Sequence, residues 1–158
     1  MDGNRRSNVM RLTSKAFTEG GEIPNKYASD GQNISPPLAW SDVPKEAKSL
    51  ALIVEDPDAP SGTFVHWVIV DLPPTTKELP EGISKPRGGH VGLNDWKHAE
   101  WGGPAPPRGR HRYVFRLYAL DRELGLAKPT KRELDAAIAG HVLAQASLTG
   151  TYQKATMA

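Results

Sequence analysis

Ionisable side chains stand at the ends of three strand-like segments of this sequence. Asp56 and Asp58 follow one apolar run, and His111 begins another directly after a loop rich in glycine and proline. His66 lies inside a third segment, the alternating apolar stretch 65–70. If these strand ends meet, two carboxylates and two imidazoles line one small pocket. Such a pocket suits a small polar ligand and an anion in particular, because an imidazole beside a carboxylate takes up a proton and then attracts negative charge.

The sequence Asp56-Pro57-Asp58 has two interpretations. In extended backbone, residues two apart point the same way, so both carboxylates would face the pocket, and Pro57 would hold them in place. In the alternative, both aspartates accept hydrogen bonds from nearby backbone N–H groups in an Asx-type turn. His66 also has an alternative role, since a histidine in an apolar strand is often a core residue whose hydrogen bonds are satisfied there.

The segment 101–109, which reads Trp-Gly-Gly-Pro-Ala-Pro-Pro-Arg-Gly, suits the wall of such a pocket. Glycine allows close backbone approach and exposes N–H groups, and proline stiffens the loop. Alternatively, the segment 101–109 is only a connecting loop on the protein surface. Arg108, Arg110 and Arg112 form a basic cluster, but Arg112 alternates away from His111, so the three arginines cannot all face one ligand.

Composition restricts the class of protein further. The 158 residues fit one domain, which we assign to residues 10–158, with residues 1–9 as a disordered N-terminal arm. The formal net charge of +2 gives no support to nucleic-acid binding. The absence of cysteine excludes disulfides, thiolate metal sites and cysteine nucleophiles. No secretory signal or transmembrane segment is recognisable, so we expect a soluble cytoplasmic protein.

Known catalytic and metal-binding motifs are absent from the sequence. It contains no Gly-x-Ser-x-Gly, no Walker-type loop, no His-Glu-x-x-His and no nucleotide-binding glycine fingerprint. The two aspartates and two histidines could bind a metal chemically, but their spacing is not typical of a metal site. We therefore expect no enzyme, no catalytic residues, no metal and no other cofactor.

Strands must position these groups. Segments 49–54 and 65–70 are apolar on both faces, except at His66, and are predicted to be buried strands in which Val65, Trp67 and Ile69 share one face. In 111–118, one face carries His111, Tyr113, Phe115 and Leu117. These patterns predict a mostly antiparallel β architecture.

One stretch near the end of the chain has the pattern of a helix. Thr130 and Glu133 form a capping-box sequence, and apolar residues recur at every fourth position, at Leu134, Ile138, Val142 and Ala146. We predict a C-terminal helix from about Lys131 to Leu148.

Ordered motifs throughout the chain point to one protein family. They are Asp30-Gly31-x-Asn33-x-Ser35-Pro36-Pro37-Leu38-x-Trp40, the Asp-Pro-Asp-Ala-Pro sequence at 56–60, His66-Trp67, Gly92-Leu93-Asn94-Asp95, Gly103-Pro104-x-Pro106-Pro107 and Gly109-x-His111-Arg112-Tyr113-x-Phe115. From about Arg11 to Lys154 the chain closely resembles the phosphatidylethanolamine-binding protein family, also called Raf kinase inhibitor-like proteins, in its bacterial and archaeal branch.

The resemblance implies a mostly β fold in which two antiparallel sheets pack as a sandwich with a few peripheral helices. It also implies a small cavity that binds phosphate-like anions, with no catalytic activity established for the family. By motif matching, the ligand-binding residues are Asp56, Asp58, His66, Pro106, Pro107, Gly109, His111 and Tyr113. The family is known for inhibiting kinases or serine proteases, and its bacterial members often look dimeric.

Three positions depart from the family pattern. Ser29 and Ala105 stand where this branch often has cysteine, so a cysteine-dependent redox role is absent. Trp101 stands where a tyrosine is common, and its larger ring is expected to narrow the mouth of the cavity.

The functional hypothesis is a non-enzymatic, homodimeric protein that binds a small anion or a phospho-headgroup and regulates a partner. The alternative is an inhibitor that blocks a serine protease or a kinase through its surface loops. A hydrolase that uses His66 or His111 as general base is disfavoured. No serine lies at an activating motif, and Ser35 and Ser61 are interpreted as turn residues.

Overall fold

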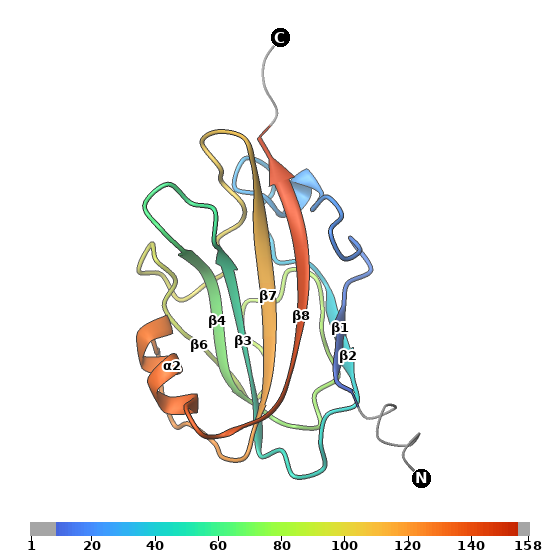
Figure 1. Cartoon of the computed structure of the whole chain (residues 1–158), viewed down its shortest axis with the longest axis vertical. Helices are drawn as coiled ribbons and strands as arrows, with labels where there is room; N and C mark the ends of the chain where they lie inside the picture. Colours follow the sequence, from blue (N-terminus) through green and yellow to red (C-terminus); the bar gives the residue numbers. More distant parts are fainter. Residues whose placement is uncertain (1–8, 155–158) are drawn as a thin grey trace.

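Two antiparallel β-sheets and one α-helix form the described part of the chain, residues 9–154 of a computed structural model (Figure 1). The larger sheet has the strand order β6-β4-β3-β7-β8, with β3 at Ser49–Asp56, β4 at Phe64–Leu72, β6 at His90–Val91, β7 at Arg110–Leu120 and β8 at Val142–Gln153. The smaller sheet has the order β1-β2-β5, with β1 at Arg11–Thr13, β2 at Leu38–Ser41 and β5 at Glu78–Leu79. The predicted two-sheet β fold is confirmed. Residues 1–8, on which most of the predicted N-terminal arm falls, lie outside the described residues, as do residues 155–158.

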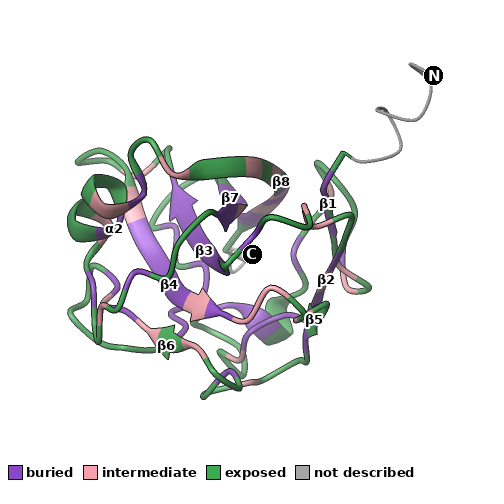
Figure 2. Cartoon of the chain, turned by 90° about the horizontal axis from the view of Figure 1, so that it is seen from below, coloured by how far each residue is buried: buried purple, intermediate pink, exposed green. Residues whose placement is uncertain are grey.

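The three strands predicted from apolar patterns form the centre of the larger sheet. β3 is buried at all eight positions, because the smaller sheet covers one of its faces and α2 (Lys131–Ile138) lies over the other. Figure 2 shows the buried residues concentrated on β3, β4 and β7, whereas α2 is largely exposed. Branched apolar residues suit such a strand, since they pack on both faces of the pleat.

A β-bulge interrupts the pairing of β3 with β4. Val54 pairs with Trp67 and the next residue, Glu55, pairs with Val65, so His66 has no partner on β3. The extra residue turns Val65 to the α2 side of the sheet while Trp67 stays in the core between the sheets. The prediction that Val65 and Trp67 share a face is therefore wrong. It assumed an uninterrupted strand.

The predicted helix starts as expected but is much shorter. Its capping box is present, since Thr130 Oγ1 accepts a hydrogen bond from the Glu133 N–H and Glu133 Oε1 accepts one from the Thr130 N–H. The helix ends at Ile138, and Gly140 follows with a φ of +80°, a conformation that closes helices. Within residues 9–154, no helix is long and apolar enough to cross a membrane.

The C-terminal element is a strand, so the prediction of a helix to Leu148 is wrong. Val142 and Ala146 belong to β8, which pairs with β7 along its whole length. A spacing of four residues fits the helical period of 3.6 and also the strand period of 2, so these positions could not distinguish the two structures. Antiparallel pairing with β7 makes this segment a strand.

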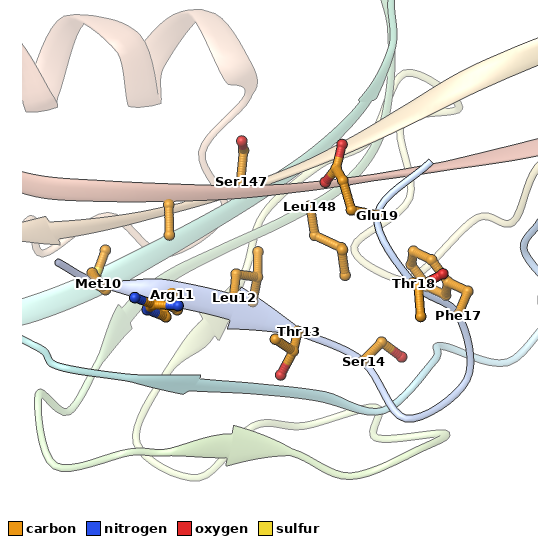
Figure 3. A pocket seen from close by; sticks show the side chains of 11 residues that line it. Met10, Arg11, Leu12, Thr13, Ser14, Phe17, Thr18, Glu19, Ser147 and Leu148 are labelled. Atoms are coloured by element: carbon orange, nitrogen blue, oxygen red, sulfur yellow. The ribbon is translucent and has the colours of Figure 1, made fainter. Parts of the chain in front are cut away.

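At the open side of the sandwich, the edge strands of the two sheets lie side by side. β1 is the edge of the smaller sheet and β8 the edge of the larger one. A groove of about 500 Å³ runs between them, and the side chains of Leu12 and Leu148 point into it (Figure 3).

Candidate functional site

A cavity of about 280 Å³ lies where β3 ends and β7 begins, beside the start of β4. The structure brings Asp56, His66 and His111 together in its wall. The cavity is lined by Asp56, Ala59, Pro60, Ser61, Phe64, His66, Trp96, Ala105, Pro107 and His111. Antiparallel pairing of β3 with both β4 and β7 places these residues at one end of the sheet.

Asp56 and His111 form a buried pair. His111 Nδ1 lies 2.6 Å from Asp56 Oδ2, and both residues are buried. Asp56 Oδ1 accepts a hydrogen bond of 2.7 Å from the Asp58 N–H, so the same carboxylate also forms the Asx-type turn. Both interpretations of Asp56 therefore hold. Because Nδ1 of His111 is engaged, Nε2 is the ring nitrogen left for a ligand.

Asp58 does not line the cavity. Its Oδ2 accepts hydrogen bonds from the Arg112 backbone N–H and Nε, both at 2.9 Å, and its Oδ1 accepts one from Arg112 Nη2 at 2.8 Å. These hydrogen bonds from Arg112 lower the pKa of Asp58 to about 2. The prediction that Asp58 faces the ligand alongside Asp56 is not supported by this placement. Asp58 instead links the turn that follows β3 to strand β7 through Arg112.

His66 is held by the loop that follows β6. Its Nδ1 lies 2.7 Å from the Gly102 carbonyl oxygen, which fixes Nδ1 as the protonated nitrogen of the neutral ring and leaves Nε2 as an acceptor. Burial lowers the pKa of His66, although the Gly102 carbonyl and the Asp56 carboxylate act in the opposite direction. His66 is therefore a neutral hydrogen-bond acceptor near pH 7.

Asp95 secures the bulge that turns His66 into the cavity. Its Oδ2 accepts a hydrogen bond of 2.8 Å from the Val65 N–H, and its own N–H donates to the Val65 carbonyl at 3.0 Å. Asn94 shapes the same loop, because its Oδ1 accepts a hydrogen bond from the Trp96 N–H. The Trp96 ring then lies edge-on to His66, with ring centroids 5.2 Å apart. These contacts fix the two aromatic walls of the cavity relative to the bulge.

Tyr113 lies beneath the cavity rather than in its wall. Its ring is buried in the core between the sheets, and its hydroxyl makes no hydrogen bond with any residue in the range 9–154. Burial, with the Asp56 carboxylate as a second cause, raises the pKa of Tyr113 above its ordinary value. Tyr113 therefore keeps its proton, and its O–H is a donor without a partner.

The loop 101–109 contributes less of the cavity wall than the sequence suggested. Ala105 and Pro107 line the cavity, but Pro106 borders a separate small pocket beside Ser29. Gly109 is exposed and supplies a φ of +69° at the turn into β7.

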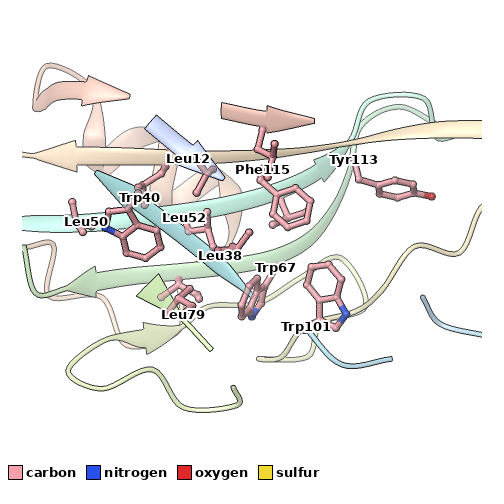
Figure 4. Packing of buried hydrophobic residues seen from close by; sticks show 14 of the residues in the cluster. Leu12, Leu38, Trp40, Leu50, Leu52, Trp67, Leu79, Trp101, Tyr113 and Phe115 are labelled. Carbon is pink, nitrogen blue, oxygen red and sulfur yellow. The ribbon is translucent and has the colours of Figure 1, made fainter. Parts of the chain in front are cut away.

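Trp101 lies in the core, so the expectation that it narrows the cavity mouth is wrong. Its ring packs between Trp67 and Phe115, at centroid distances of 5.3 and 6.1 Å (Figure 4). Its Nε1–H donates to the Tyr27 carbonyl at 3.1 Å. An indole buried with its donor satisfied suits a core position.

The sequence interpretation missed part of the cavity wall, namely Ala59, Pro60, Ser61, Phe64 and Trp96. Ala59 and Pro60 belong to the Asp-Pro-Asp-Ala-Pro motif, so their place next to Asp56 was a usable signal. Trp96 directly follows the Gly92-Leu93-Asn94-Asp95 motif, and that position was a second usable signal.

Among residues 9–154, the two imidazoles are the only groups of the cavity wall that can take up a positive charge. No lysine or arginine of that range lines the cavity, and Arg112 is engaged by Asp58. Among the described residues, no group of three or more His, Cys, Asp or Glu side chains could hold a metal ion. The wall thus combines one carboxylate, two imidazoles with free Nε2 atoms, and apolar and aromatic surface.

Comparison with known proteins identifies the family. The family model described as phosphatidylethanolamine-binding protein matches residues 13–153. The chain belongs to this family. A relative from Methanothermobacter thermautotrophicus is 49% identical, with 92% of this chain and 99% of the relative covered, and one from Aquifex aeolicus is 44% identical, with 92% and 90% covered. Both relatives are described only as UPF0098 proteins.

Solved structures of family members have the same fold. A crystal structure of a phosphatidylethanolamine-binding protein homologue from Chlamydia trachomatis, described as putative, matches with a TM-score of 0.89 and 46% identity, covering 94% of this chain and 99% of that chain. The Escherichia coli protein YbcL, described as a new member of the mammalian family, matches with a TM-score of 0.86 and 30% identity, covering 92% and 99%.

Proposed function

We propose that the protein binds a small phosphorylated headgroup in this cavity and acts as a non-catalytic regulatory protein. The observation that carries the proposal is the pair of imidazoles, His66 and His111, whose Nδ1 atoms are engaged by Gly102 and Asp56. Both rings line the cavity, which leaves their Nε2 atoms for a ligand. Imidazoles oriented through one nitrogen recognise a ligand with the other.

The two imidazoles offer opposite hydrogen-bonding roles. His66 is neutral and accepts through Nε2. The imidazolium form of His111 has a carboxylate partner in place and donates through Nε2. A ligand with a negatively charged oxygen and a nearby N–H or O–H donor fits both rings. An aminoalkyl phosphate has both groups, in its phosphate and its ammonium.

The apolar walls favour an organic phosphate over the inorganic ion. Phe64 and Trp96 contact each other edge-on at a centroid distance of 4.7 Å, and both line the cavity together with Pro60 and Pro107. Inorganic phosphate gains nothing from these surfaces. An ammonium group over the exposed Trp96 ring would gain about 0.5–1 kcal/mol. The family description, which names a phospholipid with such a headgroup, supports this ligand class.

The absence of an activated nucleophile supports a binding role. Ser61 lines the cavity, but within residues 9–154 its hydroxyl makes no hydrogen bond to either imidazole. A serine nucleophile requires a base within hydrogen-bond reach.

The proposal is tested by titrating the ¹⁵N-labelled protein with glycerophosphoethanolamine and following the imidazole resonances by NMR. We expect the Nε2 resonances of His66 and His111 to shift and the ligand phosphorus signal to stay intact. The variant His111→Gln should bind at least about tenfold more weakly, since it removes one of the two imidazoles that line the cavity. His141→Gln is the matched control, because it removes a partly exposed imidazole that is also paired with an aspartate, Asp121.

Two outcomes would overturn the proposal. Unshifted imidazole resonances at about 10 mM ligand would exclude the headgroup as a ligand of this cavity, because even millimolar affinity would then be visible. A new phosphorus signal that depends on His111 would show turnover and exclude the non-catalytic role.

A further inference from the structure

A single peptide unit connects His66 to Asn33, a residue that does not line the cavity. The Gly102 carbonyl lies 2.7 Å from His66 Nδ1, and the Gly103 N–H of the same peptide donates to Asn33 Oδ1, also at 2.7 Å. This peptide is trans and planar, so its carbonyl and its N–H point in opposite directions and can only turn together. His66 and Asn33 therefore hold the two ends of one rigid unit.

The orientation of this peptide is not fixed by side chains of its own. Both of its residues are glycine, which allows more rotation about the backbone bonds than any other residue. Larger residues do not fit, because a Cβ at Gly102 would collide with the Trp96 ring and a Cβ at Gly103 with the Tyr27 carbonyl oxygen. Hydrogen bonds to other segments must therefore set the direction of the peptide.

Asn33 supplies the hydrogen bond that lies outside the cavity. The Gly102 N–H belongs to the preceding peptide, which is held separately by the His66 carbonyl at 3.0 Å. Within residues 9–154, the Gly102–Gly103 peptide itself is bonded only to His66 Nδ1 and Asn33 Oδ1. Without Asn33, this peptide would keep its direction only through the imidazole that it orients.

The backbone of Asn33 suits this contact. Its φ of +58° lies in the left-handed region, which asparagine and aspartate enter more readily than other residues with a side chain. Its N–H donates to the Lys26 carbonyl at 3.1 Å, which fixes the turn that carries the side chain. Asparagine thus combines the required conformation with the acceptor oxygen.

We propose that Asn33 is a positioning residue that keeps the Gly102 carbonyl on His66 Nδ1 and thereby makes Nε2 an acceptor. If the peptide turned over, its N–H would face Nδ1, and the neutral ring would carry its proton on Nε2 instead. The consequence for binding rests on the proposed function. An acceptor at Nε2 favours ethanolamine, whose ammonium donates a hydrogen bond, over choline, which has no N–H.

The test reads the tautomer of His66 in the free protein from the ¹⁵N resonances of its ring at about pH 8, where an unperturbed imidazole is neutral. We expect a protonated Nδ1 in the wild type. Asn33→Gly accepts the positive φ but lacks the acceptor, so a measurable share of the protons should move to Nε2. Asn33→Asp keeps an acceptor oxygen and should retain the wild-type tautomer.

Asp42→Gly is the matched control for the glycine substitution. Asp42 also has a positive φ, of +63°, but it follows β2 and does not line the cavity. This variant should leave the tautomer of His66 unchanged. A shift equal to that of Asn33→Gly would overturn the proposal, because the effect would then not come from the bond to Gly103.

Binding of two headgroups provides a second measurement. The wild type should prefer glycerophosphoethanolamine to glycerophosphocholine, and Asn33→Gly should reduce that preference about fivefold, as expected for one hydrogen bond. A preference that stays the same while the tautomer changes would overturn the role in selection. If the wild type binds neither headgroup, only the proposed function fails, because the tautomer is measured without a ligand.

Two further outcomes would overturn the role of Asn33 itself. One is a wild-type tautomer in Asn33→Gly, and the other is the same altered tautomer in Asn33→Asp as in Asn33→Gly. If Asn33→Gly fails to fold, hydrogen exchange of the wild type still tests the contact. The Gly103 amide should be protected, and an amide that exchanges as fast as an unfolded chain would contradict the proposal.

Discussion

The ring of His66 meets the ring of Tyr113 edge to face, with centroids 5.2 Å apart and an interplanar angle of 86°. The contact crosses from β4 to β7 over the end of β3, and it requires His66 to lie on the same face of the sheet as Tyr113. The bulge at His66 provides that orientation, and Asp95 holds the bulge through Val65. The position of the His66 ring in the cavity thus depends on Asp95, a residue of the loop that follows β6.

Asp95 is therefore predicted to control ligand binding through His66. Asp95→Ala removes the acceptor for the Val65 N–H, which should cost about 1 kcal/mol of stability and weaken binding of glycerophosphoethanolamine severalfold. Asp95→Asn keeps an acceptor oxygen and should restore most of the affinity. The readout is the NMR resonance of His66 together with a calorimetric titration. An Asp95→Ala protein with unchanged His66 resonances and affinity would contradict this role.

Binding of the headgroup is predicted to strengthen as the pH falls from 8 toward 5.5. A bound anion favours a protonated imidazole over a neutral one, so acid shifts the equilibrium toward the complex. Burial lowers the pKa of His66, so His66 takes up a proton less readily than a solvent-exposed imidazole. The phosphodiester probe does not titrate there, which assigns the dependence to the protein. Affinity that stays flat across this range would exclude the mechanism.

Phe115→Ala in the core and His111→Ala in the cavity are predicted to have different effects: the first mainly lowers stability, and the second mainly weakens ligand binding. Phe115 lies two residues beyond Tyr113 on the same face of β7 and is fully buried, so Phe115→Ala should cost about 3–5 kcal/mol in the free energy of unfolding. Its folded fraction should still bind the headgroup. His111→Ala should show the reverse behaviour, with binding lost and a smaller loss of stability from the unpaired Asp56 carboxylate. A thermal melt and a titration of each variant check both halves of the prediction.

The Asp58–Arg112 ion pair is predicted to affect stability in acid. The pKa of Asp58 is lowered to about 2 in the folded protein, against 3.8 for the unperturbed side chain. A lowered folded-state pKa gives stability that is present above pH 4 and is lost as the pH falls toward 2. Asp58→Asn should therefore lower the melting temperature at pH 6 and have little effect near pH 2. An Asp58→Asn effect of equal size at both pH values would show that the ion pair is not its source.

Self-association remains a prediction that rests on the family resemblance. We expect a homodimer, because the net charge of +2 presents little repulsion between copies. Light scattering at high micromolar concentration measures the mass directly, and a monomer mass there would contradict the expectation.

The sequence by itself determined the three central strands and the start of the helix. The apolar runs at 49–54 and 65–70 predict strands that are buried on both faces, and the alternating pattern at 111–118 predicts a strand with one core face. The capping box predicts that the helix starts at Thr130. The sequence also placed Asp56 and His111 at strand ends, where antiparallel pairing makes them meet.

Tertiary structure decided the properties that depend on contacts between distant segments. Val142 and Ala146 fit either period, and only pairing with β7 made them part of a strand. Asp58 faces Arg112 because pairing of β3 with β7 brings the guanidinium within reach, and no local pattern encodes that distance. His66 enters the cavity because a bulge shifts the alternation of side chains by one residue. Asp95 stabilises the bulge by accepting a hydrogen bond from the Val65 N–H, and it lies 30 positions further along the chain than Val65.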